Sequence, residues 1–333
     1  MIFEDLPTVP RSEEVIDKAF SRAARAGRAK SGREAQESML QTASNVLSDN
    51  LEHVVTAWPD FGTVGPFYRE LSDAVVRKEL PGETGEEAGD GVSALRQALS
   101  EVTWASRKTE DLGRDYHGRL PGDADGARKL RKQGFARMAD VVREVEDDLE
   151  LLGAARDALN GLPDIRPDEP AIVVAGYPNV GKSSFVNAVT SAKNEIAEYP
   201  FTTRGIDVGH FEREHVRYQL IDTPGLLDRP ADERNEIEEQ AVSALTHLAD
   251  AVLVLVDPSE TCGYPLDAQL QLRDDVRDRF DVPVLTVANK ADRSRDVEAD
   301  HYMSVTEGEG LDAVLSAAVE TVGYEPELPF EDG

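Results

Sequence analysis

The residues best suited to chemistry form one short string, GYPNVGKSS at positions 176–184. An apolar run, Ala171–Ala175, precedes the string, and a segment expected to be helical follows it. A strand, a glycine-bracketed loop and a helix in this order surround a phosphate chain with backbone N–H groups and the positive end of the helix. Lys182 can reach the outer phosphates, and the Ser183 hydroxyl can bind Mg²⁺. The predicted phosphate-binding residues are Gly176, Asn179, Val180, Gly181, Lys182, Ser183 and Ser184.

Two further strings supply groups for a metal ion and a terminal phosphate. Asp222-Thr223-Pro224-Gly225 ends an apolar run, where the Asp222 carboxylate can hold the shell of Mg²⁺ and the Gly225 N–H can meet the terminal phosphate. The string YPFTTR at 199–204 carries two threonines, and we favour Thr203 over Thr202 as the one that reaches both the metal and that phosphate. The predicted metal ligands are Ser183, Thr203 and Asp222.

A third string, Asn289-Lys290-Ala291-Asp292, indicates which base is bound. The Asp292 carboxylate can accept two hydrogen bonds from the N1 and N2 donors of guanine, which adenine does not offer in that arrangement. A buried carboxylate left unpaired penalises the wrong base strongly. Backbone groups of Ser304 and Val305, after the next apolar segment, would support the base. The ordered set predicts a site for GTP and GDP with Mg²⁺.

The residue after Gly225 bears on catalysis. Leu226 stands where Ras-like enzymes carry a glutamine that orients the attacking water, and leucine cannot make that hydrogen bond. Either another group positions the water, or hydrolysis is slow until a partner docks. Asn179 could ligate a monovalent cation such as K⁺ that bridges the phosphates, or it could only cap the loop by side-chain to backbone bonding. The predicted catalytic residues are Asn179, Thr203 and Gly225.

The composition is strongly acidic. The 333 residues include 65 acidic and 36 basic ones, for a net charge of −29, and residues 167–333 carry most of the excess. Such a surface suits solution at multimolar salt, which indicates a halophile's protein; a surface for a basic partner is the alternative. Cys262 is the only cysteine, and the acidic start lacks an apolar stretch, so we expect a cytoplasmic protein. The longest strongly apolar run, 251–256, is too short to span a membrane.

Apolar spacing divides the chain in two. Residues 12–160 show helical periodicity with breaks at 58–62, 81–91 and 120–126, which predicts an antiparallel bundle of four or five helices. After the boundary segment GLPDIRP at 161–167, short apolar runs alternate with helical segments. We therefore expect a helical bundle over 1–166 and a doubly wound α/β domain over 167–333, with the nucleotide at the carboxyl ends of the strands.

The expected elements of the second domain follow from these runs. Strands are predicted at 171–175, 206–211, 216–221, 251–256, 284–288 and 301–303. Helices are predicted near 182–192, 232–248, 265–279 and 310–322.

The motifs together resemble the Nog family, the nucleolar GTP-binding proteins within the Obg-related GTPases. The resemblance rests on GYPNVGKSS, YPFTTRG, DTPGLLDRP, NKAD and ERNEIEEQAVSALTHL, and on LPTVPRSEEVIDKAFSRA, SDAVVRKEL and LPDIRPDEP in the helical part. It covers most of residues 5–325, and the chain is similar to an archaeal, halophile-type member. Eukaryotic members continue far beyond the GTPase domain, whereas this chain stops at Gly333, and 81–91 looks like an insertion.

The resemblance implies a magnesium-dependent GTPase that acts in assembly of the large ribosomal subunit, with the helical domain resting on ribosomal RNA. Leu226 adds the expectation of slow intrinsic hydrolysis, with a ribosomal partner completing the active site. A nucleotide-gated binding module with negligible hydrolysis is the alternative that Leu226 keeps open.

Basic residues in the helical part could contact RNA despite the acidic total. Lys18, Arg22 and Arg25 share one helix face, and Arg28, Lys30 and Arg33 follow them. A second cluster comprises Arg128, Lys129, Arg131, Lys132 and Arg137. Arginine suits phosphate contacts; the alternative is a solvated helix face with ion pairs along the helix.

Overall fold

The computed structural model divides into two compact units. It describes residues 3, 5–79, 90–160, 165–166, 168–190, 195–197, 206–223, 227–228 and 236–324. One unit contains 2–64 and 75–160, and the other contains 65–74 and everything after residue 160.

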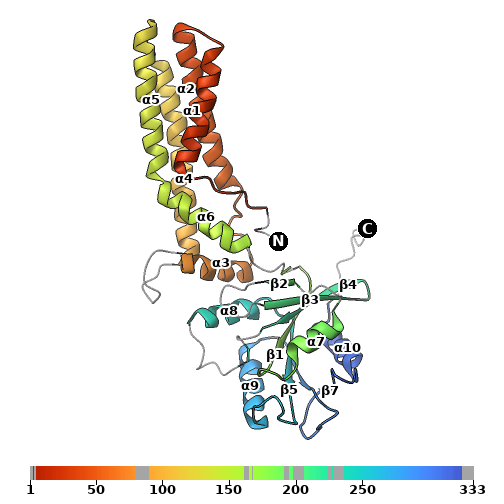
Figure 1. The fold of residues 1–333 in the computed structure, drawn as a ribbon. Helices are drawn as coiled ribbons and strands as arrows, with labels where there is room; N and C mark the ends of the chain where they lie inside the picture. Colours follow the sequence, from red (N-terminus) through yellow and green to blue (C-terminus); the bar gives the residue numbers. More distant parts are fainter. Residues whose placement is uncertain are drawn as a thin grey trace, which may run out of the picture. The chain divides into compact units, whose positions relative to one another are not determined.

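The first unit is helical, and its helices lie side by side (Figure 1). They are α1 (Ser12–Arg28), α2 (Gly32–Thr56), α4 (Gly91–Gly118), α5 (Ala124–Glu144), α6 (Glu146–Asn160) and the end of α3 (Pro66–Glu79). The apolar positions that repeat at helical spacing form the core, among them Leu47 and Met138, which are fully buried. The rings of Phe20 and Phe135 stack with centroids 4.4 Å apart and join α1 to α5.

Aspartates define the starts of two of these helices. Asp90 accepts hydrogen bonds from the backbone N–H groups of Val92 and Ser93, and Asp123 accepts one from Gly126. These carboxylates satisfy N–H groups that have no partner within the helix. The predicted break at 58–62 lies between α2 and α3, and the one at 120–126 overlaps the first turn of α5, which begins at Ala124. Most of the acidic segment at 81–91 lies outside the described residues.

The helical periodicity continues through 130–159 without a visible break, but the structure divides this segment. Val145 leaves the helical conformation, with φ −108° and ψ 22°, so that α5 ends and α6 begins on either side of it. Its side chain is nevertheless buried, which preserves the apolar pattern across the break. Because Val145 stays buried, the apolar spacing continues through the turn, and the periodicity alone does not reveal that the helix ends there.

Residues 65–74, the start of α3, group with the α/β unit. The Tyr68 hydroxyl donates a hydrogen bond to the Ile165 carbonyl, and His247 Nε2 lies 3.1 Å from Glu70 Oε1. The predicted position of the boundary, between 166 and 167, stays a prediction.

The second unit is built on a mostly parallel sheet with the order β2-β3-β4-β1-β5-β6-β7. Its strands are β1 (Ala171–Ala175), β2 (Glu195–Ala197), β3 (Ile206–Arg213), β4 (Val216–Asp222), β5 (Ala251–Val256), β6 (Val284–Ala288) and β7 (His301–Tyr302). β3 runs antiparallel to both β2 and β4, and the other pairs are parallel. β1 and β5 are buried along their whole length, because their continuous apolar runs lie in the middle of a sheet covered on both faces.

Helices cover the two faces of this sheet: α7 (Lys182–Val189) and α10 (Leu311–Val322) on one, α8 (Glu236–Thr246) and α9 (Leu266–Arg279) on the other (Figure 1). The predicted doubly wound fold is confirmed. α7 is shorter than predicted, since Thr190 is already extended. β2 was not predicted, because three residues carry no measurable alternation and the strand exists only through its pairing with β3. Among the described residues, no helix is long and apolar enough to cross a membrane.

Candidate functional site

Four strands end at the same edge of the sheet and bring the predicted site residues together. β1 leads into the loop 176–181, β4 ends at Asp222, β5 is followed by Asp257, and β6 is followed by Asn289. Parallel neighbours carry their carboxyl ends to one edge, so segments up to 113 residues apart meet there.

The loop 176–181 closes only with glycine at both ends. Gly176 has φ +135°, and a Cβ there would lie 2.4 Å from the Leu255 carbonyl oxygen. Gly181 has φ +108°, and a Cβ there would lie 2.2 Å from Nδ2 of Asn289. A side chain at either position would both strain the backbone and displace a neighbouring strand end. Gly181 directly precedes α7, so the positive end of that helix faces the loop.

Lys182 is folded back over this loop. Its side chain is buried, and Nζ donates hydrogen bonds to the carbonyl oxygens of Gly176 at 2.7 Å and Tyr177 at 3.1 Å. Burial lowers the pKa of the Lys182 ammonium, while Asp222 and Asp228 oppose that shift. The ammonium is thus held against the backbone of the loop 176–181.

Ser183 and Asp222 form a pair that suits a hard divalent cation. Ser183 Oγ donates to Asp222 Oδ2 at 2.5 Å, and Asp222 Oδ1 is buried with no hydrogen-bond partner among the described residues. Burial raises the pKa of the Asp222 carboxyl, which the Ser183 hydrogen bond and Lys182 oppose. An orphaned carboxylate oxygen beside a hydroxyl is an oxygen donor set of the kind that Mg²⁺ prefers, so the residues present fit this metal.

Asn289 connects the loop 176–181 to the segment 304–305. Its Nδ2 donates to the Val180 carbonyl at 2.8 Å, and its Oδ1 accepts from the Val305 N–H at 3.3 Å. Asn289 and Ser304 are both buried, and Val180 is fully buried. One amide therefore joins three of the predicted binding segments.

Lys290 and Asp292 follow on the same loop. Lys290 has φ +56°, and its Nζ lies 2.7 Å from Asp257 Oδ2. The Asp292 side chain is 30% exposed, and its nearest ion pair is a long one of 3.9 Å to Arg293. Asp292 therefore retains acceptor oxygens for a ligand, whereas Lys290 is already engaged within the protein.

Asn179 lies at the exposed tip of the loop. Its φ is +63°, a conformation that asparagine tolerates better than most residues, and its side chain makes no hydrogen bond to the described residues. The geometry therefore gives no support to a capping role. Ser184 is exposed on the first turn of α7. Thr203, Gly225 and Leu226, which carry the predicted switch and catalytic roles, lie outside the described residues.

Asp257 is a site residue that the motif analysis did not identify. It directly follows the buried strand β5, is itself fully buried, and contacts Lys290. Its position in the sequence could have identified it. A carboxylate that directly follows an uninterrupted apolar strand is expected at the same sheet edge as Asp222 and Asn289.

A second surface of interest lies on the helical unit. Arg22, Arg25 and Arg28 of α1 are exposed and make no ion pair with the described residues, whereas Lys30 and Arg33 pair with Glu34 and Glu37. The α5 cluster is also exposed except for Arg131, whose guanidinium lies 4.8 Å from the centroid of the Phe135 ring. Since Phe20 and Phe135 pack together, the two basic clusters stand on adjacent helices.

Comparison with known families gives two matches that do not overlap. Residues 3–166 match the NOG1 N-terminal helical domain, and residues 236–292 match nucleolar GTP-binding protein 1 (NOG1).

Similar proteins occur in archaea and eukaryotes. An uncharacterised protein of Methanocaldococcus jannaschii is 33% identical over 304 residues, which are 87% of this chain and 81% of that protein. Nucleolar GTP-binding protein 1 of Eremothecium gossypii is 32% identical over 90% of this chain, and that of Saccharomyces cerevisiae is 32% identical over 81%. The matched parts are only 46% and 41% of these two fungal proteins, so the chain spans less than half of their length.

A solved structure is also similar in sequence. The crystal structure of a putative nucleolar GTP-binding protein 1 from Plasmodium falciparum is 32% identical, covers 49% of this chain and 90% of its own, and superposes with a TM-score of 0.44.

Proposed function

Because the chain belongs to the nucleolar GTP-binding protein 1 family, we propose that it binds GTP and GDP and hydrolyses GTP to GDP and phosphate. The observation that carries the proposal is the Asn289 amide, which joins the loop 176–181 to the segment 304–305 beside Asp292. The hydrogen-bond donors for the phosphates and the carboxylate that contacts the base are thereby held at one edge of the sheet, where a single nucleotide can contact both.

Each binding segment has a distinct role in this proposal. Backbone N–H groups of the loop 176–181, Lys182 and the N-terminus of α7 bind the phosphates, and Ser184 belongs to the same first turn. Asp292 accepts from the guanine N1 and N2 donors, while Ser304 and Val305 support the base. The buried Asn289 amide keeps the two ends of the site at a fixed distance.

Ser183 and Asp222 would hold Mg²⁺, together with Thr203 from outside the described residues. The free Asp222 oxygen and the adjacent Ser183 hydroxyl support this assignment. When bound, Mg²⁺ would neutralise negative charge on the phosphate oxygens. The hydrogen bond from Ser183 to Asp222 fixes the orientation of the Asp222 carboxylate, and therefore the position of its negative charge.

Hydrolysis in this proposal relies on Asn179, Thr203 and Gly225 rather than on a glutamine. Leu226 cannot orient water, so the intrinsic rate is slow and a ribosomal partner completes the site. The exposed, unbonded Asn179 side chain is available as a ligand for K⁺ at the phosphates. The same leucine favours a second candidate, a nucleotide-gated binding module with negligible hydrolysis. Turnover measured with and without ribosomal particles separates the two.

We further propose that the large ribosomal subunit precursor and its RNA are the partners. Support comes from the exposed arginines of α1, which make no ion pair with the part of the chain that the structure describes, and from the basic cluster on the adjacent helix α5. Arginine pairs well with phosphate oxygens, and RNA offers these along its backbone.

The guanine assignment is tested by nucleotide competition. Asp292→Asn should lower the affinity for GTP at least about a hundredfold and raise that for XTP, since an amide inverts the donor and acceptor pattern that a carboxylate reads. Competition against a fluorescent guanine nucleotide measures both affinities. Asp296→Asn, which removes an exposed carboxylate from the same loop, is the matched control and should change neither. Equal affinity of the unmodified protein for GTP and ATP would contradict the proposal.

A further inference from the structure

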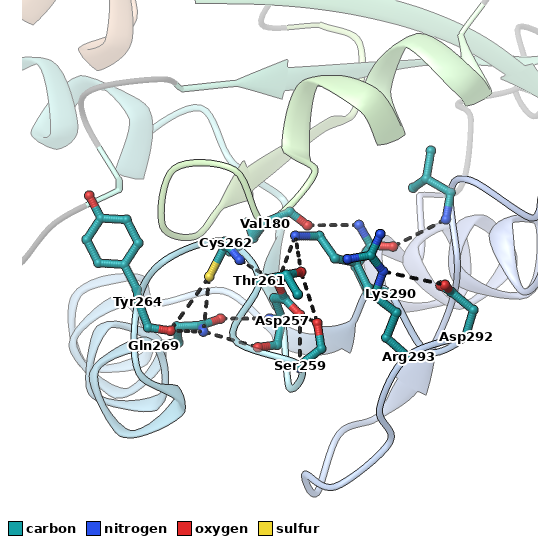
Figure 2. A network of polar contacts seen from close by, with 12 residues as sticks. Val180, Asp257, Ser259, Thr261, Cys262, Tyr264, Gln269, Lys290, Asp292 and Arg293 are labelled. Atoms are coloured by element: carbon teal, nitrogen blue, oxygen red, sulfur yellow. Dashed lines mark hydrogen bonds and ion pairs between the residues drawn. The ribbon is translucent and has the colours of Figure 1, made fainter.

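The loop 257–264, which follows β5, surrounds one buried carboxylate. Asp257 Oδ1 accepts hydrogen bonds from the Ser259 N–H at 2.9 Å and the Ser259 hydroxyl at 2.5 Å. Its Oδ2 accepts from the Thr261 hydroxyl at 2.9 Å and the Cys262 N–H at 2.8 Å. These four contacts come from the loop itself and fix the orientation of the carboxylate (Figure 2).

The fifth contact comes from another strand end. Lys290 Nζ donates to Asp257 Oδ2 at 2.7 Å and to the Thr261 hydroxyl at 3.1 Å. Asp257 is fully buried, and a buried charge needs a counter-charge, which the described residues supply only through Lys290. Figure 2 shows the Lys290 side chain extended from its own loop toward Asp257 and Thr261.

The loop 257–264 is fixed on two other sides as well. Gln269 of α9 accepts from the Asp257 N–H at 2.7 Å and donates to the Tyr264 carbonyl at 2.9 Å. The Tyr264 ring packs against the ring of Tyr177, with centroids 4.4 Å apart, and Tyr177 belongs to the loop 176–181. The carboxylate that engages Lys290 is therefore part of a rigid connection between α9 and two of the proposed nucleotide-binding loops.

A lysine held in this way is pre-organised. Its long side chain has many rotamers, and a free lysine would lose that freedom when a base packs against it. Asp257 and Thr261 use two of the three ammonium donors, so the conformation is selected when the protein folds. A ligand that contacts the lysine stem then binds without ordering it.

We propose that Asp257 is a positioning residue for the guanine nucleotide: it holds Lys290 extended beside Asn289 and Asp292, so that the lysine meets the base in one conformation. This inference rests on the proposed function, and it adds the loop 257–264 to the binding site as its support. Asp257 acts through Lys290 and contacts no ligand itself.

A double-mutant cycle on the full chain tests the inference, with fluorescent mant-GDP as the probe. Asp257→Asn removes the charge that holds Lys290 but leaves an oxygen that can accept from Ser259. Lys290→Met removes the ammonium and keeps an unbranched apolar stem. Asp257→Asn should raise the Kd about tenfold, the scale of coupling between contacting groups. In the presence of Lys290→Met, the same change should alter the Kd by less than about twofold.

A purely structural role gives a different result. If Asp257 only shaped its own loop, Asp257→Asn would raise the Kd by the same factor with and without Lys290→Met, and the proposal would be overturned. One control accompanies the cycle. Asp250→Asn removes a carboxylate just before β5, at the opposite end of that strand, and should leave the Kd unchanged. Among the described residues, the Asp250 carboxylate accepts a hydrogen bond only from the Ala171 N–H.

The cycle also has a fallback and a separate readout for the function. Thermal unfolding of each variant verifies folding. If Asp257→Asn does not fold, Thr261→Val supplies the same cycle, because the Thr261 hydroxyl contacts both Asp257 and Lys290. An equal loss with and without Lys290→Met would then overturn the inference. Failure of the unmodified, folded protein to bind mant-GDP would overturn the proposed function and, with it, the inference.

Discussion

At the scale of residues, the site combines polar atoms that have hydrogen-bond partners within the protein with polar atoms that have none among the described residues. Asn289 and Lys182 have partners within the protein, and these partners fix the shape of the site. Asp222 Oδ1 and the Asn179 side chain have none among the described residues. The first is buried and the second is exposed, so a metal ion at Asp222 and a solvent-derived cation at Asn179 are the ligands we expect.

Asn179 provides the catalytic prediction. If its side chain ligates K⁺, GTP turnover should rise about tenfold when K⁺ replaces Na⁺, because a cation at the phosphates stabilises charge that develops in the transition state. Asn179→Ala should remove this difference and spare most GTP affinity. The measurement is phosphate release at constant ionic strength, with folding verified in both salts. Identical turnover of the unmodified protein in K⁺ and Na⁺ would eliminate the cation and favour a group from a ribosomal partner.

At the scale of elements, the loop 257–264 shows how one carboxylate can order a segment. Burial works to raise the pKa of the Asp257 carboxyl, but hydrogen bonds from Lys290, Ser259 and Thr261 outweigh it and lower the pKa to about 2. Cys262 lies in the same segment, and burial raises the pKa of its thiol, so the thiol is poorly reactive in the folded protein.

The depressed pKa predicts a pH window for stability. An unfolded aspartate takes up a proton near its ordinary pKa of 3.8, whereas folded Asp257 does so only near 2. Its stabilising contribution is therefore complete above about pH 4 and is lost as the pH falls toward 2, with a magnitude of about 2 kcal/mol. The difference in free energy of unfolding between the unmodified protein and Asp257→Asn should be constant from pH 7 to 5 and shrink below about pH 4.

Urea unfolding at each pH measures this difference, and the many other carboxylates cancel because both proteins carry them. Asp250→Asn serves as the control. Asp250 lies outside the Asp257–Lys290 pair, so this variant controls for the loss of one carboxylate. A constant difference for Asp257→Asn down to pH 3 would contradict the assigned pairing.

At the scale of the whole molecule, charge is unevenly distributed over a strongly acidic chain. The net charge is −29, yet the exposed arginines of α1 and the basic face of α5 gather on adjacent helices of one unit. A halophilic origin for the acidic remainder stays a prediction. The basic clusters on α1 and α5 are the surfaces through which so acidic a chain could contact RNA.

Reversing Arg22, Arg25 and Arg28 to Glu should abolish association with large-subunit precursors and leave GTP affinity unchanged, since the proposed nucleotide site lies in the other unit. Sedimentation of cell extracts through a sucrose gradient measures the association. The matched control reverses Arg114, Arg119 and Arg143, which each have an acidic ion-pair partner three or four residues away, and thus makes the same charge change elsewhere. Normal association of the first variant would contradict the proposed RNA contact and show that these arginines belong to a solvated helix face.

Local patterns alone determined much of this protein. The bounds of β1 and β5 follow from uninterrupted apolar runs, and the loop 176–181 follows from glycines whose positive φ other residues rarely adopt. The helical and α/β parts follow from two different apolar periods. Such features are predictable because the residues that cause them lie close together in the sequence.

Tertiary structure alone decided the contacts between distant segments. The pairing of Asp257 with Lys290 depends on β5 and β6 being neighbours, and the adjacency of the two basic clusters depends on the packing of α1 against α5. The turn at Val145, the short strand β2 and the grouping of 65–74 with the α/β unit were likewise invisible in the sequence. The partners of Lys290 and of Phe20 are remote in the chain, so neither spacing nor composition near these residues carries the signal of the contact.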